Sequence, residues 1–330
     1  MTDPRAPAHR VLPLLLGVLL ATGTAGAWWL DSARPVPPDE VVRADAWLRT
    51  EALLEVPSPD PVPAAPWEDV RADLARQLEA LGPAPDDRTS AAARAQRPSP
   101  AGGTDAVGGG GSVAAAPTAL RTTATVLAGD ALAAEDPALA RVLAAAAVSR
   151  VTAARQLDGS PAPAGDDLCD VGGDPAPGGT TAPGAVLWSA LDRAGYAFEA
   201  LAARAGTAPD GGAPPAAAPA GAVPAELAAR ARGDVEELLE VPVAGRVLAA
   251  DPGLPAGAYV LADDVRARPG RVADTAARDV QDAAAHVLGR GEPGARCWAL
   301  VALERATGLR AGLTGEVGAL PGVVRDDPPR

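Results

Sequence analysis

Stretches rich in proline and glycine divide this 330-residue sequence into short blocks, and they constrain its fold more than any other feature. Proline inside a helix removes a backbone hydrogen bond and clashes with the preceding turn, so no regular helix continues through these stretches. The blocks between them are rich in alanine and leucine, and their apolar residues recur every three or four positions. We therefore expect separate α-helices joined by turns and linkers.

The supply of core side chains favours the same fold class. Aromatic residues make up only 3% of the chain, and isoleucine, lysine and asparagine are absent. The core must then be built from alanine, leucine and valine, and such small side chains favour closely packed helices over a β-sandwich. The expected fold class is all-α: an N-terminal transmembrane or signal helix, helical hairpin segments, and a C-terminal four-helix bundle.

The charge balance excludes one class of partner. The formal net charge is −13 at pH 7, whereas proteins that bind nucleic acid carry a basic surface. We therefore expect no nucleic-acid partner and an acidic, well-solvated surface. Acidity alone identifies no partner of another kind.

The stretch from Val11 to Leu30 contains no charged residue and sets the expected compartment. Its length suits a membrane-spanning helix, and the small residues near its end also suit a cleavable secretory signal. Arg5 and Arg10 precede it and Asp31 follows it, which predicts that the N-terminus stays inside. We expect a single-pass membrane protein whose bulk lies outside the cytoplasm, or a secreted protein if the signal is cleaved.

The breaks and the apolar blocks together predict the organisation of the chain. The expected segments are a signal or anchor (1–35), two helical segments with a proline-rich hinge (36–96), a flexible linker (97–112), a helical segment that packs on the bundle (113–157), a second linker (158–183), the four-helix bundle (184–320) and a disordered tail (321–330). Within 113–157, Asp136 and Pro137 have the residue types of an N-cap and a first helical position. An apolar stripe follows them.

Four consecutive amphipathic blocks predict the bundle. They cover about Ala185 to Ala205, Ala225 to Glu240, Arg271 to Leu288, and a last helix that opens at Pro293. The last two are joined by a short turn and the middle two by a long crossing, which is the connectivity of ferritin-like bundles. Glycines in the last helix predict fraying after Gly312.

Cys169 and Cys297 are the only cysteines. In an oxidising compartment an isolated pair is a disulfide candidate, and closing so long a loop stabilises a fold by about 4–5 kcal/mol in the chain-entropy view. Two unpaired thiols, one in a loop and one on a buried helix face, are the alternative. The spacing does not decide between them.

Several runs resemble a family of ferritin-like-domain proteins of unknown function from high-GC bacteria. They are AVLWSALDRAGYAFEALAARAG (185–206), LPAGAYVL (254–261), ARCWALVALE (295–304) and, upstream, DPALARVLAAAAVSRVTAA (136–154). The resemblance implies a ferritin-like bundle behind a secretion signal or anchor, and no established activity. Where the family pattern has a Glu-His pair in the first bundle helix, this chain has Asp192 and Arg193, so the resemblance does not supply a metal site.

A ferritin-like di-metal site needs a Glu from two helices and a Glu-x-x-His motif from the other two, and this sequence has no Glu-x-x-His. His286 is the one histidine after the anchor stretch, and Asp279 and Asp282 precede it on one helical face. The candidate metal ligands are Glu199, Asp234, Asp279, Asp282, His286 and Glu304. Alternatively, Asp282 and His286 form only a surface hydrogen-bonded pair.

No catalytic constellation stands out, since the chain has no Gly-x-Ser-x-Gly motif. Tyr196 and Tyr259 are expected to pack with their hydroxyl groups at the surface. We expect a non-catalytic binding or scaffold protein of the cell envelope, without a cofactor, whose partner is a protein or a small ligand. The alternative is a degenerate di-metal carboxylate protein that binds iron or manganese for storage or oxidation.

Overall fold

The computed structural model describes residues 35–57, 64–96, 115–159, 168–169, 182–205, 223–240, 259–261 and 265–323. Every regular element in these ranges is an α-helix, which confirms the all-α class. The anchor or signal stretch, Val11 to Leu30, lies outside the described residues, as do most of the expected linkers. Residues 321–323, expected in the tail, instead form a turn in which Pro321 is buried.

The helices follow the expected blocks closely. The first part of the chain forms α2 (Pro38–Leu54), α3 (Ala64–Leu81), α4 (Asp87–Gln96), α6 (Ala115–Ala133) and α7 (Pro137–Asp158). The second part forms α8 (Ala182–Ala205), α9 (Ala225–Glu240), α11 (Pro269–Arg290) and α12 (Pro293–Thr314). The expected bounds of α9 agree with the structure at both ends. Helix α4 was not expected, because it is short and its few apolar residues are alanines.

Local signals explain where the central helix α7 begins and ends. The Asp136 side chain accepts a 2.8 Å hydrogen bond from the Ala138 amide, and Pro137 occupies the first turn. Gly159 ends the helix with a φ of 67°, a left-handed conformation that favours glycine. Gly315 ends α12 in the same way with a φ of 78°, so this helix continues past Gly312, where fraying was expected.

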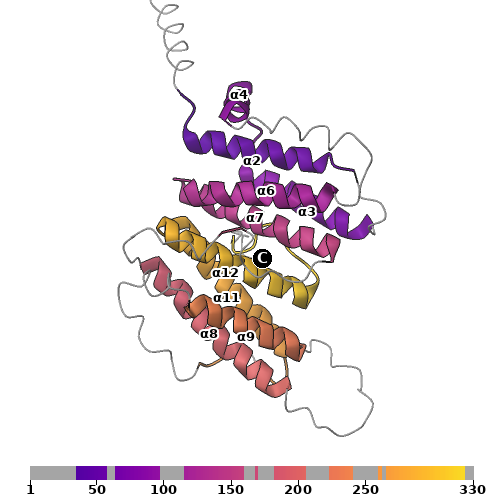
Figure 1. The fold of residues 1–330 in the computed structure, drawn as a ribbon, viewed down its shortest axis with the longest axis vertical. Coiled ribbons are helices and arrows are strands. Elements are labelled where there is room, and N and C mark those ends of the chain that lie inside the picture. The colour runs from indigo at the N-terminus through magenta and orange to yellow at the C-terminus, as the bar shows by residue number, and fades with distance from the viewer. Residues whose placement is uncertain are drawn as a thin grey trace, which may run out of the picture.

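Figure 1 shows the helices stacked in layers along the long axis of the molecule. Helices α4 and α2 lie at one end, α3, α6 and α7 follow, then α12 and α11, and α8 and α9 lie at the other end. Helix α7 packs against α6 on one side and against α11 and α12 on the other. At the far end α8 contacts α9 and α11, and α12 contacts α9 and α11. These four helices therefore close around a shared interior.

One apolar core runs through these layers, from Ala46 on α2 to Ala306 on α12. The expected stripe of α8 is buried within it at Leu187, Leu191, Phe198 and Leu201. In α7, by contrast, burial extends beyond the expected stripe: every residue from Leu143 to Arg155 is buried. A helix enclosed on all sides has no polar face, and the layers on both sides of α7 enclose it in this way.

Helix α7 is also the one described helix with the length and composition of a membrane span. However, 72% of its apolar window is buried inside the fold. Its apolar character is therefore accounted for by its place at the centre of the molecule.

Buried hydrogen bonds join the helices α2, α3 and α7 to one another and to the C-terminal turn. The Arg150 side chain on α7 is 1% exposed, and it donates hydrogen bonds to Gln77 on α3 and to Thr50 on α2. Gln77 in turn donates a 3.1 Å hydrogen bond to the carbonyl of Ala319 in the C-terminal turn. Burial lowers the pKa of Arg150 to about 9, so its guanidinium remains charged at neutral pH.

Candidate functional site

The six candidate metal ligands do not come together in one place. Asp279, Asp282 and His286 line an open groove between α8 and α11. Glu199 is exposed on α8. Asp234 borders the interior between the four C-terminal helices, and Glu304 is buried toward α7. Within the described ranges, no three His, Cys, Asp or Glu side chains come together in a group that could hold a metal ion.

Glu304 is engaged in the interface between α12 and α7. Its side chain is fully buried, and one carboxylate oxygen lies 2.8 Å from a guanidinium nitrogen of Arg155. Taking a carboxylate out of water is costly unless a cation compensates its charge. Glu304 therefore has a structural role in holding α12 on the central helix.

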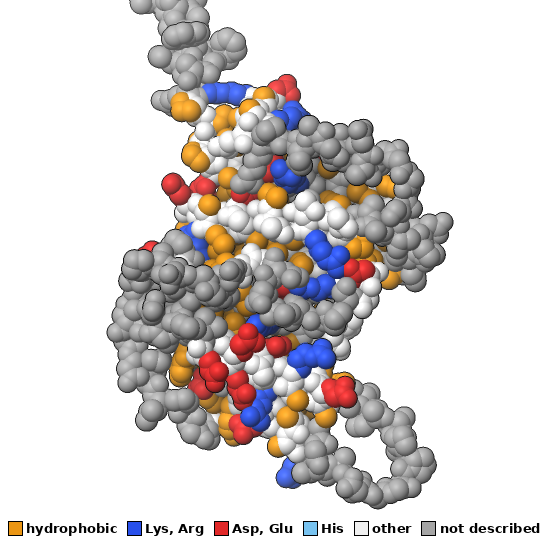
Figure 2. Space-filling view, in the orientation of Figure 1, with side chains coloured by type: hydrophobic (Ala, Val, Ile, Leu, Met, Phe, Trp, Pro, Cys, Tyr) orange, Lys and Arg blue, Asp and Glu red, His pale blue; other side chains and the backbone are white. Residues whose placement is uncertain are grey.

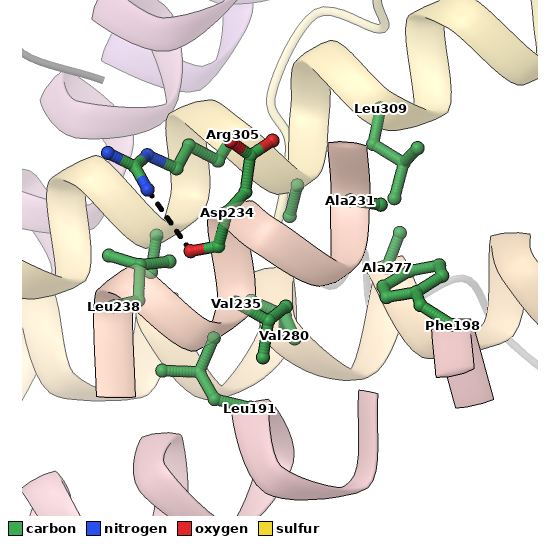
Figure 3. A pocket seen from close by; sticks show the side chains of 12 residues that line it. Leu191, Phe198, Ala231, Asp234, Val235, Leu238, Ala277, Val280, Arg305 and Leu309 are labelled. Carbon is green, nitrogen blue, oxygen red and sulfur yellow. Dashed lines mark hydrogen bonds between the residues drawn. The ribbon is translucent and has the colours of Figure 1, made fainter. Parts of the chain in front are cut away.

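Figure 3 shows the interior enclosed by α8, α9, α11 and α12, where a di-metal site would lie in a ferritin-like bundle. The side chains that meet there are mostly apolar, and they include Leu191, Phe198, Val235, Leu238 and Val280. The cavity that they leave measures about 20 Å³, which is room for about one water molecule.

Two polar residues border this cavity. Arg305 donates a 3.1 Å hydrogen bond to the carbonyl of Asp234, drawn as the dashed line in Figure 3, and a 3.0 Å hydrogen bond to the Glu237 carboxylate. Burial raises the pKa of the Asp234 carboxyl, against the lowering effect of Arg305. Arg305 thus fastens α12 to α9.

The groove between α8 and α11 is much more spacious than the interior cavity. One part of it measures about 590 Å³ and a neighbouring part about 170 Å³, and the two share Ala190, Arg193 and Asp279. The walls combine small apolar and polar side chains: Ala185, Val186, Ser189, Ala194 and Ala197 from α8, Val272, Thr275, Ala276, Asp282, Ala283 and His286 from α11, and Val260 and Leu261 from the preceding segment.

This groove exposes apolar side chains. Val186 is 48% exposed and Val260 is 99% exposed, and they are the exposed large hydrophobic residues in the described part of the chain. Both belong to the groove walls. Val186 borders the larger part of the groove and Val260 the smaller part.

The charges in the groove do not fully compensate each other. Arg193 lies 3.6 Å from Asp279, and this is an ion pair with both side chains partly exposed. Asp282, one helical turn further on, has no ion pair within the described part of the chain. Burial raises the pKa of the Asp282 carboxyl and the negative charge of Asp279 raises it further, against the lowering effect of the nearby charges of Arg278 and Arg310. No hydrogen bond joins Asp282 to His286, so the alternative of a hydrogen-bonded surface pair was wrong.

An aromatic cluster adjoins the groove at Arg193. The Tyr259 hydroxyl donates a hydrogen bond to Asp192. The Tyr259 and Tyr196 rings pack edge to face, with 5.8 Å between their centroids. The Arg193 guanidinium lies 5.8 Å from the centre of the Tyr259 ring. The hydroxyl of Tyr259, which was expected to lie at the surface, is therefore hydrogen-bonded to a side chain of α8. Asp192 and Arg193 thus both hold the 259–261 segment and the groove wall in place.

The surface around α8 and α9 carries charges of both signs. Figure 2 shows acidic side chains gathered among arginines on the lower part of the visible face, where Figure 1 places these helices. Arg232 and Glu236 on α9 form one such exposed pair at 2.6 Å. Exposed pairs of this kind contribute little to stability.

Cys169 and Cys297 form a disulfide bond with a Cα–Cα distance of 5.8 Å. It ties the segment before α8 to α12 across 128 residues of sequence. Cys169 also packs against the main core.

Comparisons with protein-family models, with curated proteins and with solved structures find no match to this chain. Function is therefore argued from the geometry of the interior and of the groove.

Proposed function

We propose that this chain is a non-catalytic helical-bundle protein of the cell envelope that acts by binding or scaffolding. In this proposal α8, α9, α11 and α12 form a ferritin-like four-helix bundle whose metal site is incomplete. The connectivity supports it, because the last two helices are joined by a short turn at Gly291 and the middle two by a long crossing.

One observation carries the proposal. The interior that would hold a di-metal site is packed with apolar side chains around a cavity of about 20 Å³. Two metal ions with carboxylate and imidazole ligands need a polar centre in such a bundle. Meanwhile Glu304, the most deeply buried candidate ligand, is engaged with Arg155 in another interface. A bundle with such an interior is suited to a structural role or to binding a partner at its surface.

The place in the cell envelope rests on two further observations. The uncharged stretch from Val11 to Leu30 has the length of a membrane anchor or the pattern of a signal. The Cys169–Cys297 disulfide suits an oxidising compartment. Both favour a chain whose bulk lies outside the cytoplasm.

Elemental analysis of the purified full chain tests the non-catalytic proposal. The chain is purified in mild detergent without chelators, and iron, manganese and zinc are measured per mole of protein. We expect less than about 0.1 metal ion per chain, because carboxylates that do not share one site hold such ions loosely. One or two tightly held ions per chain would overturn the proposal.

A degenerate metal-binding protein is the second candidate, favoured by the shared position of Asp279, Asp282 and His286 along one groove. Imidazole with two carboxylates is a ligand set that iron and manganese accept. In this case His286→Ala abolishes metal uptake, while Glu236→Ala, on the exposed face of α9, leaves it unchanged. Equal metal content in the parent and the His286→Ala variant refutes the site.

A further inference from the structure

Helix α8 has a core face and a groove side, and on the groove side Val186, Ser189 and Arg193 are at least partly exposed while Ala190 and Ala197 form a buried floor. Leu187, Leu191 and Phe198 form its core face. A second series, Val186, Ser189, Ala190, Arg193 and Ala197, lines the groove. Apart from the adjacent Ser189 and Ala190, these positions are spaced by three or four residues and so lie along one side of the helix, next to the core face.

Helix α11 repeats this arrangement. Val272, Thr275, Ala276, Asp279, Ala283 and His286 run along its groove side at similar spacing. The two series face each other across an open trough that measures about 590 Å³ in its larger part. Two packed helices with small side chains along their shared edge form the seat of a third helix, since ridges of side chains fit into such a groove.

The charges in the trough indicate which kind of helix fits it. Arg193 is already paired with Asp279 at 3.6 Å. The Asp282 carboxylate has no ion pair in the described part of the chain, and it lies in the same stretch of the groove as the half-exposed Val186. A complementary partner therefore presents apolar side chains to Val186 and a cation to Asp282.

We propose that the α8–α11 groove binds an amphipathic helix of a partner protein, with a lysine or arginine of that helix paired to Asp282. This inference rests on the proposed binding function and names the surface and the chemistry of the partner. A second copy of the chain fits less well. A two-fold interface places the same groove on both sides, and the one arginine among its lining residues, Arg193, already pairs with Asp279, so a second copy brings no unpaired arginine of this surface to Asp282.

The probe is a synthetic helical peptide of about 18 residues, or about five turns. Its apolar face carries leucine and alanine with one central lysine, and a matched peptide carries glutamate in place of that lysine. Binding to the full chain in mild detergent is measured by fluorescence anisotropy, with detergent alone as the blank. We expect the lysine peptide to bind with a micromolar Kd and the glutamate peptide to bind at least tenfold more weakly.

Two matched variants locate the binding. Val186→Glu places a charge in the groove and is expected to weaken the lysine peptide at least tenfold. Ala203→Glu adds the same charge to an exposed position of α8 outside the groove and is expected to leave the Kd within a factor of two. Asp282→Arg is expected to reverse the preference, so that the glutamate peptide becomes the tighter binder.

Hydrogen exchange on the unmodified chain gives a readout that needs no variant: bound peptide is expected to slow exchange along α8 and α11 relative to α6. Several results would overturn the proposal. One is that the two peptides bind with equal affinity, and another is that Val186→Glu and Ala203→Glu weaken the binding of the lysine peptide equally. A third is that the bound peptide slows hydrogen exchange in helices away from the groove. The last is that the chain forms a dimer that Val186→Glu dissociates.

Metal content is measured on the same samples. If the chain is free of metal and does not bind the lysine peptide, the groove proposal is overturned and the proposed function stands. Tightly bound stoichiometric metal overturns the function, whatever the peptide does.

Discussion

The Nε–H of Arg150 donates a 3.0 Å hydrogen bond to the side-chain oxygen of Gln77, across the interface between α7 and α3. Both side chains are about 1% exposed, and no carboxylate pairs with the guanidinium in the described part of the chain. The Gln77 amide also donates to Ser149 at 3.2 Å and to the Ala319 carbonyl at 3.1 Å. One glutamine side chain therefore connects the central helix to the C-terminal turn.

Replacing Gln77 with leucine is expected to destabilise the fold by about 1–3 kcal/mol, since a buried guanidinium N–H and a buried carbonyl lose their partners. The double variant Gln77→Leu/Arg150→Met removes the buried charge as well, so its loss is expected to be smaller than the sum of the two single losses. Urea unfolding of the four proteins measures this coupling. Strict additivity would show that the two side chains do not act together.

The Cys169–Cys297 disulfide closes a loop with a sequence separation of 128 residues. Replacing both cysteines with serine is expected to lower the free energy of unfolding by about 5 kcal/mol, because the unfolded chain regains the entropy of the open loop. Urea unfolding with and without reductant measures the effect. Reductant should lower the stability of the parent by a similar amount and leave the double variant unchanged, and an equal response of both proteins would contradict this.

The carboxyl of Asp234 gives a pH-dependent effect. Burial raises its pKa in the folded chain above the ordinary value of 3.8, so ionisation disfavours the folded state at neutral pH. Asp234→Asn is therefore expected to raise Tm at pH 7. The gain should shrink as the pH falls through the folded-state pKa, and it should vanish below about pH 3.8, where both states are protonated.

Thermal unfolding of the parent and the Asp234→Asn variant between pH 3 and pH 7 measures this difference. Asp274→Asn is a control of opposite sign, because Asp274 pairs with Arg310 and Arg278 at 2.8 Å each. Its loss is expected to lower Tm at pH 7. A gain for Asp234→Asn that grows as the pH falls would contradict the assignment.

The C-terminal turn depends on a glycine. Gly322 has a φ of +73°, and a Cβ there would lie 2.6 Å from the Gln281 carbonyl oxygen and 3.0 Å from the Ala285 Cβ. Gly318 has a similar φ of +77°, but a Cβ there would meet nothing within 4 Å. Gly322→Ala is expected to cost about 1–3 kcal/mol more than Gly318→Ala, which carries the backbone penalty alone. The two urea midpoints test this, and equal midpoints would mean that the turn does not lie against α11.

Much of the secondary structure could be predicted because its signals are local. Asp136 and Pro137 mark the start of α7, Pro293 opens α12, and proline after Glu240 fits the end of α9. Each of these residues acts on its own turn of backbone, so no distant contact is needed to interpret it. Helix α4 was not predicted, because its only apolar residues are alanines and the helix is too short for them to show a clear helical period.

The candidate site was less accessible to prediction. The spacing of Asp279, Asp282 and His286 placed them on one side of α11, and the structure agrees in that all three line the groove. Their neighbours could not be inferred, because Arg193 and Val186 come from a helix about 90 residues earlier in the chain. The engagement of Glu304 with Arg155 also joins distant segments, and no periodic pattern encodes such a pair.

The amino-acid sequence alone determined that the chain is helical, where most helices begin, and which stripe of α8 is apolar, since these follow from backbone sterics and residue spacing. Only the tertiary structure decided that α7 is enclosed on all sides, that Arg150 is buried beside Gln77, and that Val186 and Arg193 of α8 stay exposed along a groove. Those features depend on which helices meet, and that is set by the packing of the whole chain.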